Sequence, residues 1–373
     1  MSPVAVRSRL AAVAAAVLIP LGIASVTVAV VGGTERTTAP ILATDLPRLP
    51  GEPAAGAQFH ATWTNYTAGD RTRILDELAA AGLEWVRIDV GWASLEPTRP
   101  GSIDPYYRDR VDAVVAEAGA RGLKVLLTPW LTPGWAGPGE RRPPDDPADY
   151  ARFLQWASSR YRGQVAAWEI WNEPNLPEFW KGDARQYAAL LRAAYPAVKA
   201  GDPDALVVLG GPAYNDTEWL ASLYDLGSRN AFDVMATHPY QGVANAPPET
   251  PDDGTRGTLT HVAAVRDLMV ANGDADKPIW FTEFGWSAHP TAPGAPSSEL
   301  GVTEIEQADY FIRTLRWVAE HAPYVSTVFW YNERARTTGN AHLDGYGLLT
   351  DDLRPRPVYD AVRSYLTGGT APR

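Results

Sequence analysis

The sequence contains no cysteine among its 373 residues, so neither a disulfide nor a thiolate metal site can contribute to the protein. Histidine is scarce, and the six histidines are scattered along the chain, which gives no reason to expect a metal site. No basic patch is present either, because the net charge is −11 and the acidic residues are distributed over the whole sequence. We therefore expect no nucleic-acid partner and a fold held by its apolar core alone.

That core can be large, since 45% of the residues are hydrophobic and 21% are charged, as in one large globular domain or two small ones. Long uncharged runs are otherwise missing, but Arg7 and Arg9 precede residues 10–33, which carry no charge. Such a start is typical of a secretory signal peptide or a retained membrane anchor. The run is long for a signal peptide and Pro20 interrupts it, so both alternatives stay open. In either case we expect the protein to be extracellular, either secreted or anchored to the outer face of the cytoplasmic membrane.

The composition divides the rest of the chain into three parts. Residues 34–56 are rich in proline, threonine and alanine and show no periodicity, which is typical of a linker. All fourteen tryptophans lie beyond Thr62. The expected organisation is a linker over 34–56, one folded domain over 57–368 and a short tail over 369–373.

Within the domain, apolar runs alternate with amphipathic stretches. The predicted strands are 58–63, 85–90, 124–128, 166–171, 205–209, 232–237, 278–282 and 325–330, and the predicted helices are 71–81, 106–121, 147–161, 184–200, 217–226, 258–271, 304–321 and 357–366. Eight strand-helix units without a second compositional regime predict a (β/α)₈ TIM barrel as a single catalytic domain. A doubly wound open sheet is the alternative, but no glycine-rich phosphate loop follows the first strand.

In such a barrel the chemistry lies where strands end on the carboxyl-terminal face. The fourth strand ends in "WEIWNEPN", which contains Asn172 and Glu173, and the seventh ends in "FTEFGW", which contains Glu283. Two carboxyl groups facing each other across a barrel mouth are what glycosidic bond cleavage requires, with one as a proton donor and the other as an ionised carboxylate.

Further polar and aromatic residues lie at other strand ends. Arg87 and Tyr240 can hold the second glutamate ionised, Asn172 can bind a sugar 2-hydroxyl, and indoles can stack on sugar rings. Arg87 could instead pair structurally with Asp89 or Glu169. The remaining candidates for substrate binding are His60, which could also be a core histidine, together with His238, Trp130, Trp286 and Trp330.

"WEIWNEPN" and "PIWFTEFGW" resemble the acid/base and nucleophile strands of clan A glycoside hydrolases, the retaining (β/α)₈ enzymes that include cellulases, mannanases and family 39 β-xylosidases. This resemblance implies that Glu173 is the acid/base and Glu283 the nucleophile. It also implies that Arg87 matches the arginine of strand two in the clan, Tyr240 or His238 the strand-six residue, and Trp330 the tryptophan that floors the sugar site.

The sequence therefore predicts a retaining glycoside hydrolase that cleaves β-glycosidic bonds of poly- or oligosaccharides by double displacement and needs no cofactor. Two alternatives remain open: a catalytically inactive glycan-binding barrel at the cell surface, and a transglycosylase with the same site. The sugar, its linkage, endo or exo action and the oligomeric state are not predicted.

Overall fold

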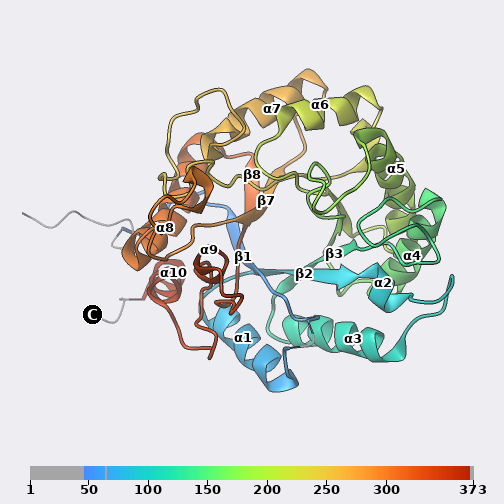
Figure 1. The fold of residues 1–373 in the computed structure, drawn as a ribbon, viewed down its shortest axis with the longest axis horizontal. Helices are drawn as coiled ribbons and strands as arrows, with labels where there is room; N and C mark the ends of the chain where they lie inside the picture. The colour runs from blue at the N-terminus through green and yellow to red at the C-terminus, as the bar shows by residue number, and fades with distance from the viewer. Residues whose placement is uncertain (1–45, 64, 370–373) are drawn as a thin grey trace, which may run out of the picture. The chain divides into compact units, whose positions relative to one another are not determined.

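The computed structural model describes residues 46–63 and 65–369, all within the compact unit Ile41–Arg373. Eight parallel strands form a sheet of order β5-β4-β3-β2-β1-β8-β7-β6, and a bridge between Val208 and Val234 brings its two edges together. The strands are β1 (Ala54–Gln58), β2 (Trp85–Gly91), β3 (Lys124–Trp130), β4 (Ala167–Ile170), β5 (Leu206–Leu209), β6 (Met235–Thr237), β7 (Ile279–Phe284) and β8 (Val325–Trp330). Helices surround them (Figure 1), so the predicted (β/α)₈ barrel is confirmed.

The helices follow the predicted order. They are α1 (Ala68–Ala80), α2 (Trp92–Leu95), α3 (Pro105–Gly119), α4 (Pro147–Arg160), α5 (Ala184–Gly201), α6 (Thr217–Asp225), α7 (Val262–Ala271), α8 (Glu304–His321), α9 (Ala341–Asp344) and α10 (Pro357–Thr367), with 3-10 turns at Arg229–Ala231, Leu259–His261 and Ser297–Glu299. Capping boxes begin α1 at Thr67, α5 at Asp183 and α8 at Thr303. The sequence prediction missed α2 and α9, because a single helical turn shows no hydrophobic period.

The first strand lies earlier than the predicted range 58–63. β1 has the sequence AAGAQ, which lacks the β-branched and aromatic residues on which the prediction relied. Small residues are needed here because a Cβ on Gly56 would lie 2.7 Å from the Cβ of Trp85 and 2.8 Å from the Phe329 ring. The strand thus begins inside the segment 34–56, while residues 1–33, 34–45 and 370–373 lie outside the described part of the chain.

Two buried layers position the site. In the lower half of the barrel, Trp85, Trp280 and Phe329 form a cluster with smaller apolar side chains, and the two indole rings lie 5.0 Å apart. A larger apolar cluster fills the space between the strands and the surrounding helices. Above the lower cluster, at the carboxyl ends of the strands, the interior becomes polar and contains Arg87 and Glu169. The barrel therefore has an apolar floor beneath a charged mouth.

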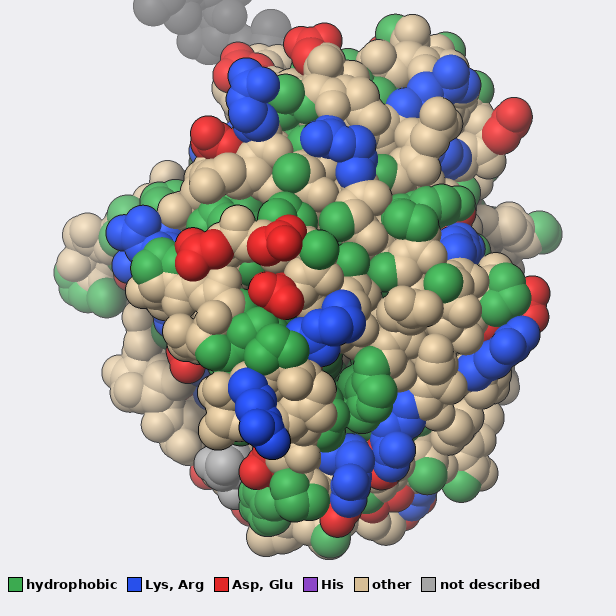
Figure 2. Space-filling view, turned by 90° about the vertical axis from the view of Figure 1, so that its right-hand side faces the viewer, with side chains coloured by type: hydrophobic (Ala, Val, Ile, Leu, Met, Phe, Trp, Pro, Cys, Tyr) green, Lys and Arg blue, Asp and Glu red, His purple; other side chains and the backbone are tan. Residues whose placement is uncertain are grey.

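The outer surface carries charges of both signs. On the face drawn in Figure 2, acidic and basic side chains are intermixed and form no large area of one sign. Over residues 46–63 and 65–369, no helix combines the length and the apolar character that crossing a bilayer requires.

Replacing Gly56 by alanine tests the close packing of β1. The added Cβ must displace Trp85 or Phe329, so we expect Gly56→Ala to lower the free energy of unfolding by about 1–3 kcal/mol. Urea unfolding followed by tryptophan fluorescence measures this change. Gly134→Ala is the matched control, because a Cβ there meets nothing within 4 Å. Equal stability of the two variants would contradict the packing argument.

Candidate active site

Arg87 on β2 is the centre of the polar cluster at the barrel mouth. Its side chain is fully buried and donates to four groups from three other strands and the β4 loop: Nε to Glu169 at 2.6 Å, Nη1 to Gln58 and Glu283 at 2.7 Å each, and Nη2 to Asn172 at 2.7 Å. A buried guanidinium is stable only when it is paired and hydrogen-bonded in this way. One residue therefore fixes the positions of groups on β1, β4 and β7.

Glu169 is the structural partner of Arg87. Its carboxylate also accepts a hydrogen bond from Thr128 Oγ1 at 2.8 Å and one from the Gly211 amide at 3.2 Å. Of the two structural partners that the sequence offered for Arg87, Glu169 forms the buried ion pair. Arg87 thus has both roles that the sequence left open, because it pairs with Glu169 and also contacts Glu283 and Asn172.

Glu283 reaches the mouth because β7 is irregular. Thr282 faces the interior, so strict alternation would turn Glu283 outward, but the β7–β8 register shifts between Phe281 and Phe284. Tyr240 donates to Glu283 Oε2 at 3.0 Å. Burial alone would raise the pKa of Glu283, but the charges of His238 and Arg87 and the Tyr240 hydrogen bond outweigh it and hold this pKa below its usual range.

Glu173 lies in the loop that follows β4, where the backbone is strained. Trp171 and Glu173 have φ angles of 73° and 41°, in the left-handed region that costs a residue with a side chain about 1–3 kcal/mol. The indole of Trp171 holds this turn, because Nε1 donates to the carbonyl of Phe179 at 3.0 Å and the ring packs 5.0 Å from that of Trp180. The turn directs the Glu173 carboxylate into the mouth.

His238 on the β6 loop orients the Glu173 carboxylate. Its Nδ1 lies 2.8 Å from Glu173 Oε1, and its Nε2 lies 3.0 Å from Thr282 Oγ1. Burial raises the pKa of Glu173, and the nearby charge of Glu283 adds to this, against the lowering effect of His238. Burial lowers the pKa of His238, but the two carboxylates outweigh it, so this pKa lies above its usual value. The two glutamates therefore differ, Glu173 favouring the protonated form and Glu283 the ionised form.

The two carboxyl groups are close together. One ligand atom each from Glu173, His238 and Glu283 lie within 4.8 Å of one another. A divalent cation could use such a set. However, the guanidinium of Arg87 already supplies a positive charge at 2.7 Å from Glu283, and Nδ1 of His238 already contacts Glu173. The donors thus have partners within the protein.

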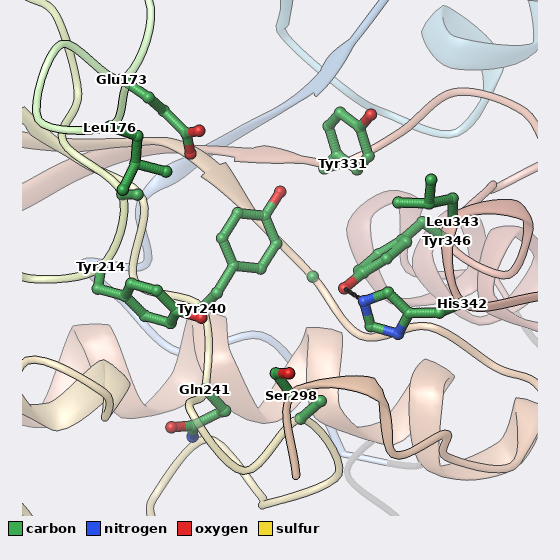
Figure 3. A pocket seen from close by; sticks show the side chains of 13 residues that line it. Glu173, Leu176, Tyr214, Tyr240, Gln241, Ser298, Tyr331, His342, Leu343 and Tyr346 are labelled. Atoms are coloured by element: carbon green, nitrogen blue, oxygen red, sulfur yellow. Dashed lines mark hydrogen bonds between the residues drawn. The ribbon is translucent and has the colours of Figure 1, made fainter. Parts of the chain in front are cut away.

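A cavity of about 240 Å³ opens above this cluster. Figure 3 shows the Glu173 carboxylate and the Tyr240 hydroxyl projecting into it, with Tyr331 on the other side. Tyr214 and Tyr346 complete an aromatic wall. An apolar pocket with a few converging polar groups is typical of a small-molecule or sugar site.

Two predicted sugar platforms lie away from this cavity. Trp330 is fully buried between β8 and α8, where its ring stacks on Phe311 with centroids 4.8 Å apart. Trp286 is 2% exposed and packs against Tyr310, and its Nε1 donates to the Ala246 carbonyl at 2.8 Å. Both side chains point toward the helices, so the structure does not bring them together with the glutamates.

His60 and Trp130 lie at the edge of the mouth. His60 is 3% exposed and its Nδ1 lies 3.0 Å from Glu333, so its contacts are those of a hydrogen-bonded interior histidine beside the site. Trp130 is half-buried and lines a neighbouring cavity of about 450 Å³ together with Trp63 and Asp89. Of the predicted residues, Glu173, Glu283, Asn172, Arg87, His238 and Tyr240 form one contacting group.

Four residues of this region were missed. Tyr331 and Glu333 follow β8, Gln58 ends β1, and Thr282 lies on β7. Period-two alternation along β8 would have identified Tyr331, since Phe329 faces the interior and Trp330 must then face the helices. Gln58 could be placed only once β1 was assigned to its observed range.

Comparison with known proteins identifies similar sequences and folds. The family model described as "Cellulase (glycosyl hydrolase family 5)" matches residues 48–335. A β-xylosidase of Caldicellulosiruptor saccharolyticus is 26% identical over 244 residues, covering 60% of this chain and 47% of that protein. A β-xylosidase of Geobacillus stearothermophilus is 31% identical over 224 residues, covering 53% and 41%. The chain thus spans about half the length of these two relatives.

The fold is shared with a family 39 glycoside hydrolase from the gut symbiont Bacteroides cellulosilyticus WH2. The TM-score is 0.68 at 25% sequence identity, with 85% of this chain and 64% of that chain covered. The likeness extends over the barrel described above.

Removing the structural carboxylate tests the central role of Arg87. In Glu169→Gln the buried guanidinium loses its partner on β4, so we expect the free energy of unfolding at pH 7 to fall by about 3 kcal/mol. Urea unfolding followed by circular dichroism measures this loss. Glu84→Gln, an exposed residue before β2, is the control and should leave stability unchanged. A loss no larger than that of the control would show that Glu169 does not compensate the charge.

Proposed function

The chain belongs to the cellulase family, glycosyl hydrolase family 5, and from this premise we propose that it is a retaining glycoside hydrolase that cleaves β-glycosidic bonds. In this proposal Glu173 is the acid/base and Glu283 the nucleophile. The observation that carries it is the pair of adjacent buried carboxyl groups with opposite pKa shifts, raised at Glu173 and lowered at Glu283.

The spacing of the carboxyl groups supports retention of configuration. A retaining pair is about 5–5.5 Å apart, whereas an inverting pair is about 6.5–9.5 Å apart to admit a water molecule. Carboxylate oxygens of Glu173 and Glu283 lie within 4.8 Å of each other, which favours direct attack by one of them.

The first step forms a glycosyl-enzyme. A carboxylate oxygen of Glu283 attacks the anomeric carbon while Glu173 gives its proton to the glycosidic oxygen, so the leaving sugar departs as an alcohol. Arg87 and Tyr240 hold the Glu283 carboxylate in place. Asn172 accepts a hydrogen bond from Arg87 through Oδ1, which turns its amide Nδ2 toward the sugar as a donor for the 2-hydroxyl.

The second step releases the sugar. Once Glu283 is esterified its negative charge is lost, so the repulsion that favours protonated Glu173 disappears and the pKa of Glu173 falls. Glu173 then takes a proton from water, and the resulting hydroxide attacks the anomeric carbon and frees Glu283. His238 remains in contact with Glu173 through both steps and stabilises its ionised form.

We propose a β-linked oligo- or polysaccharide as the substrate. The tyrosines around the cavity and Trp130 beside it offer faces for sugar rings. Two of the relatives are β-xylosidases by name, which makes β-xylosides the first substrates to test. The charged start and the uncharged residues 10–33 further support action outside the cytoplasm, with secretion or anchoring as the two routes.

Azide rescue tests the two roles. In Glu283→Ala we expect loss of turnover on β-linked aryl glycosides, restored by azide as a glycosyl azide of inverted configuration, because the small anion occupies the place of the nucleophile. In Glu173→Ala, azide instead attacks the glycosyl-enzyme, so the azide product retains its configuration. Product NMR distinguishes the two, with Glu84→Ala as the active control. Identical products from both variants would reject the assignment, and no turnover by the wild type on any glycoside would favour a glycan-binding barrel.

The pH profile tests the opposite pKa shifts. Activity requires ionised Glu283 and protonated Glu173, so the profile of kcat/KM should have two limbs. The acidic limb, where Glu283 becomes protonated, should lie at a pH below the usual glutamate pKa of about 4.3, and the alkaline limb, where Glu173 loses its proton, at a pH above it. The alkaline limb belongs to the coupled pair of glutamates. With an aryl glycoside whose leaving group needs no protonation, Glu173→Gln should lose the alkaline limb and keep the acidic one. An unchanged alkaline limb would assign it to another group.

A further inference from the structure

A third cavity lies beside the proposed site. Its volume is about 310 Å³, and its lining includes Trp63, Asn65 and Tyr66 after β1 and Arg334 and Arg336 after β8. None of these residues takes part in the mechanism described above. The lining also contains Asp351, so its arginines exceed its acidic residues by one.

Aromatic rings hold both guanidinium groups in place. The Arg334 guanidinium lies 4.0 Å from the ring centre of Tyr66, and that of Arg336 lies 4.8 Å from the ring centre of Trp63. Arg336 also donates through Nη1 to the Tyr331 hydroxyl at 3.0 Å. A stacked guanidinium keeps N–H groups in its plane for a ligand, so little side-chain entropy is lost on binding.

The positive charge of this pair is not neutralised by ion pairs. Within residues 46–63 and 65–369, neither arginine has a carboxylate oxygen within 4.0 Å, although Arg334 Nη1 lies 3.5 Å from the main-chain carbonyl of Asp351. The carboxylates of Asp70 and Asp344 influence the cluster but accept hydrogen bonds from their own turns.

Beneath the two arginines, the Glu333 carboxylate is engaged by His60 and Tyr66 in the interior. Each guanidinium thus has one face against an aromatic ring, and its remaining N–H groups are available to an anionic ligand.

The position of the cavity indicates which part of a substrate would reach it. β8 lies across the barrel from β4, and Glu173 follows β4. The leaving group departs on the side of the acid, so the sugar that stays on Glu283, the glycone, extends toward β8 and β1. Tyr331 lines the main cavity and contacts Arg336, which makes the two cavities neighbours.

We propose that Arg334 and Arg336 bind the carboxylate of a uronic acid in the glycone part of the substrate. This proposal rests on the proposed function and names its substrate class. Guanidinium groups recognise carboxylates through paired N–H donors, which neutral sugars cannot match. A sulfate ester is also an anion that guanidinium groups can bind, and the experiment distinguishes it from the carboxylate.

The experiment compares β-linked oligosaccharides that carry glucuronic acid with the same oligosaccharides after reduction of the carboxyl group, and with a sulfated neutral counterpart. Calorimetry on the full chain carrying Glu283→Gln measures binding without turnover, and wild-type kinetics measure kcat/KM. The test variant is Arg334→Gln/Arg336→Gln, and Arg162→Gln, an exposed arginine in the turn before β4 at the opposite end of the barrel, is the control.

We expect the acid to bind at least about tenfold more tightly than its reduced form, because the charged carboxylate gains hydrogen bonds from the two guanidinium groups that a neutral hydroxyl cannot match. In the double arginine variant this ratio should approach one, and high salt should lower it in the wild type. The control should keep the wild-type ratio.

Equal binding of acid and reduced sugar, or a ratio unchanged in the double variant, would overturn the uronic acid proposal. A preference for the sulfated sugar over the acid would overturn it in favour of sulfate. If wild-type turnover of every oligosaccharide is absent, the proposed catalysis fails, and the binding ratio still decides the role of the arginines.

Discussion

The buried guanidinium of Arg87 is the interaction on which the mouth of the barrel depends. An isolated charge in this position would be very costly, and two carboxylates, an asparagine and a glutamine compensate it. Because these partners come from β1, β7 and both the strand and the loop of β4, their mutual positions are fixed by one planar group. The same contacts that stabilise the charge therefore set the distance between Asn172 and Glu283.

The charge balance of this cluster also explains why the two glutamates differ. Arg87 pairs with Glu169 and Glu283, and His238 adds a proton site between Glu173 and Glu283. One protonated carboxyl group beside one ionised group leaves less buried charge uncompensated than two ionised groups would. Glu173, which lacks a contact with Arg87, is the one that holds its proton more readily.

Much of this arrangement could be predicted from the sequence because strand order and strand ends follow from hydrophobic pattern. Eight strand-helix units place Arg87, Glu173 and Glu283 on one rim without further information. The exceptions have local physical causes. The sequence of β1, AAGAQ, has low β propensity and does not resemble a strand. Small residues occur there because Trp85 and Phe329 leave no room for larger ones. The resemblance implied that Trp330 floors the sugar site, whereas alternation along β8 turns this indole toward α8. The irregularity of β7 could not be read from the sequence, although it decides which way Glu283 points.

The two layers of the barrel have different roles: the apolar floor stabilises the fold, and the polar mouth contains the candidate site. Apolar packing of Trp85, Trp280 and Phe329 stabilises the floor, whereas the mouth contains a buried ion network and a left-handed turn at Trp171 and Glu173, both of which cost free energy. Replacing a buried ion network by well-packed apolar side chains is often neutral or stabilising. Stability alone therefore does not account for Arg87, Glu169 and Glu283 at this level of the barrel. The mechanism that we propose accounts for them, because it requires an ionised carboxylate beside a protonated one, and the apolar floor contributes stability that offsets their cost.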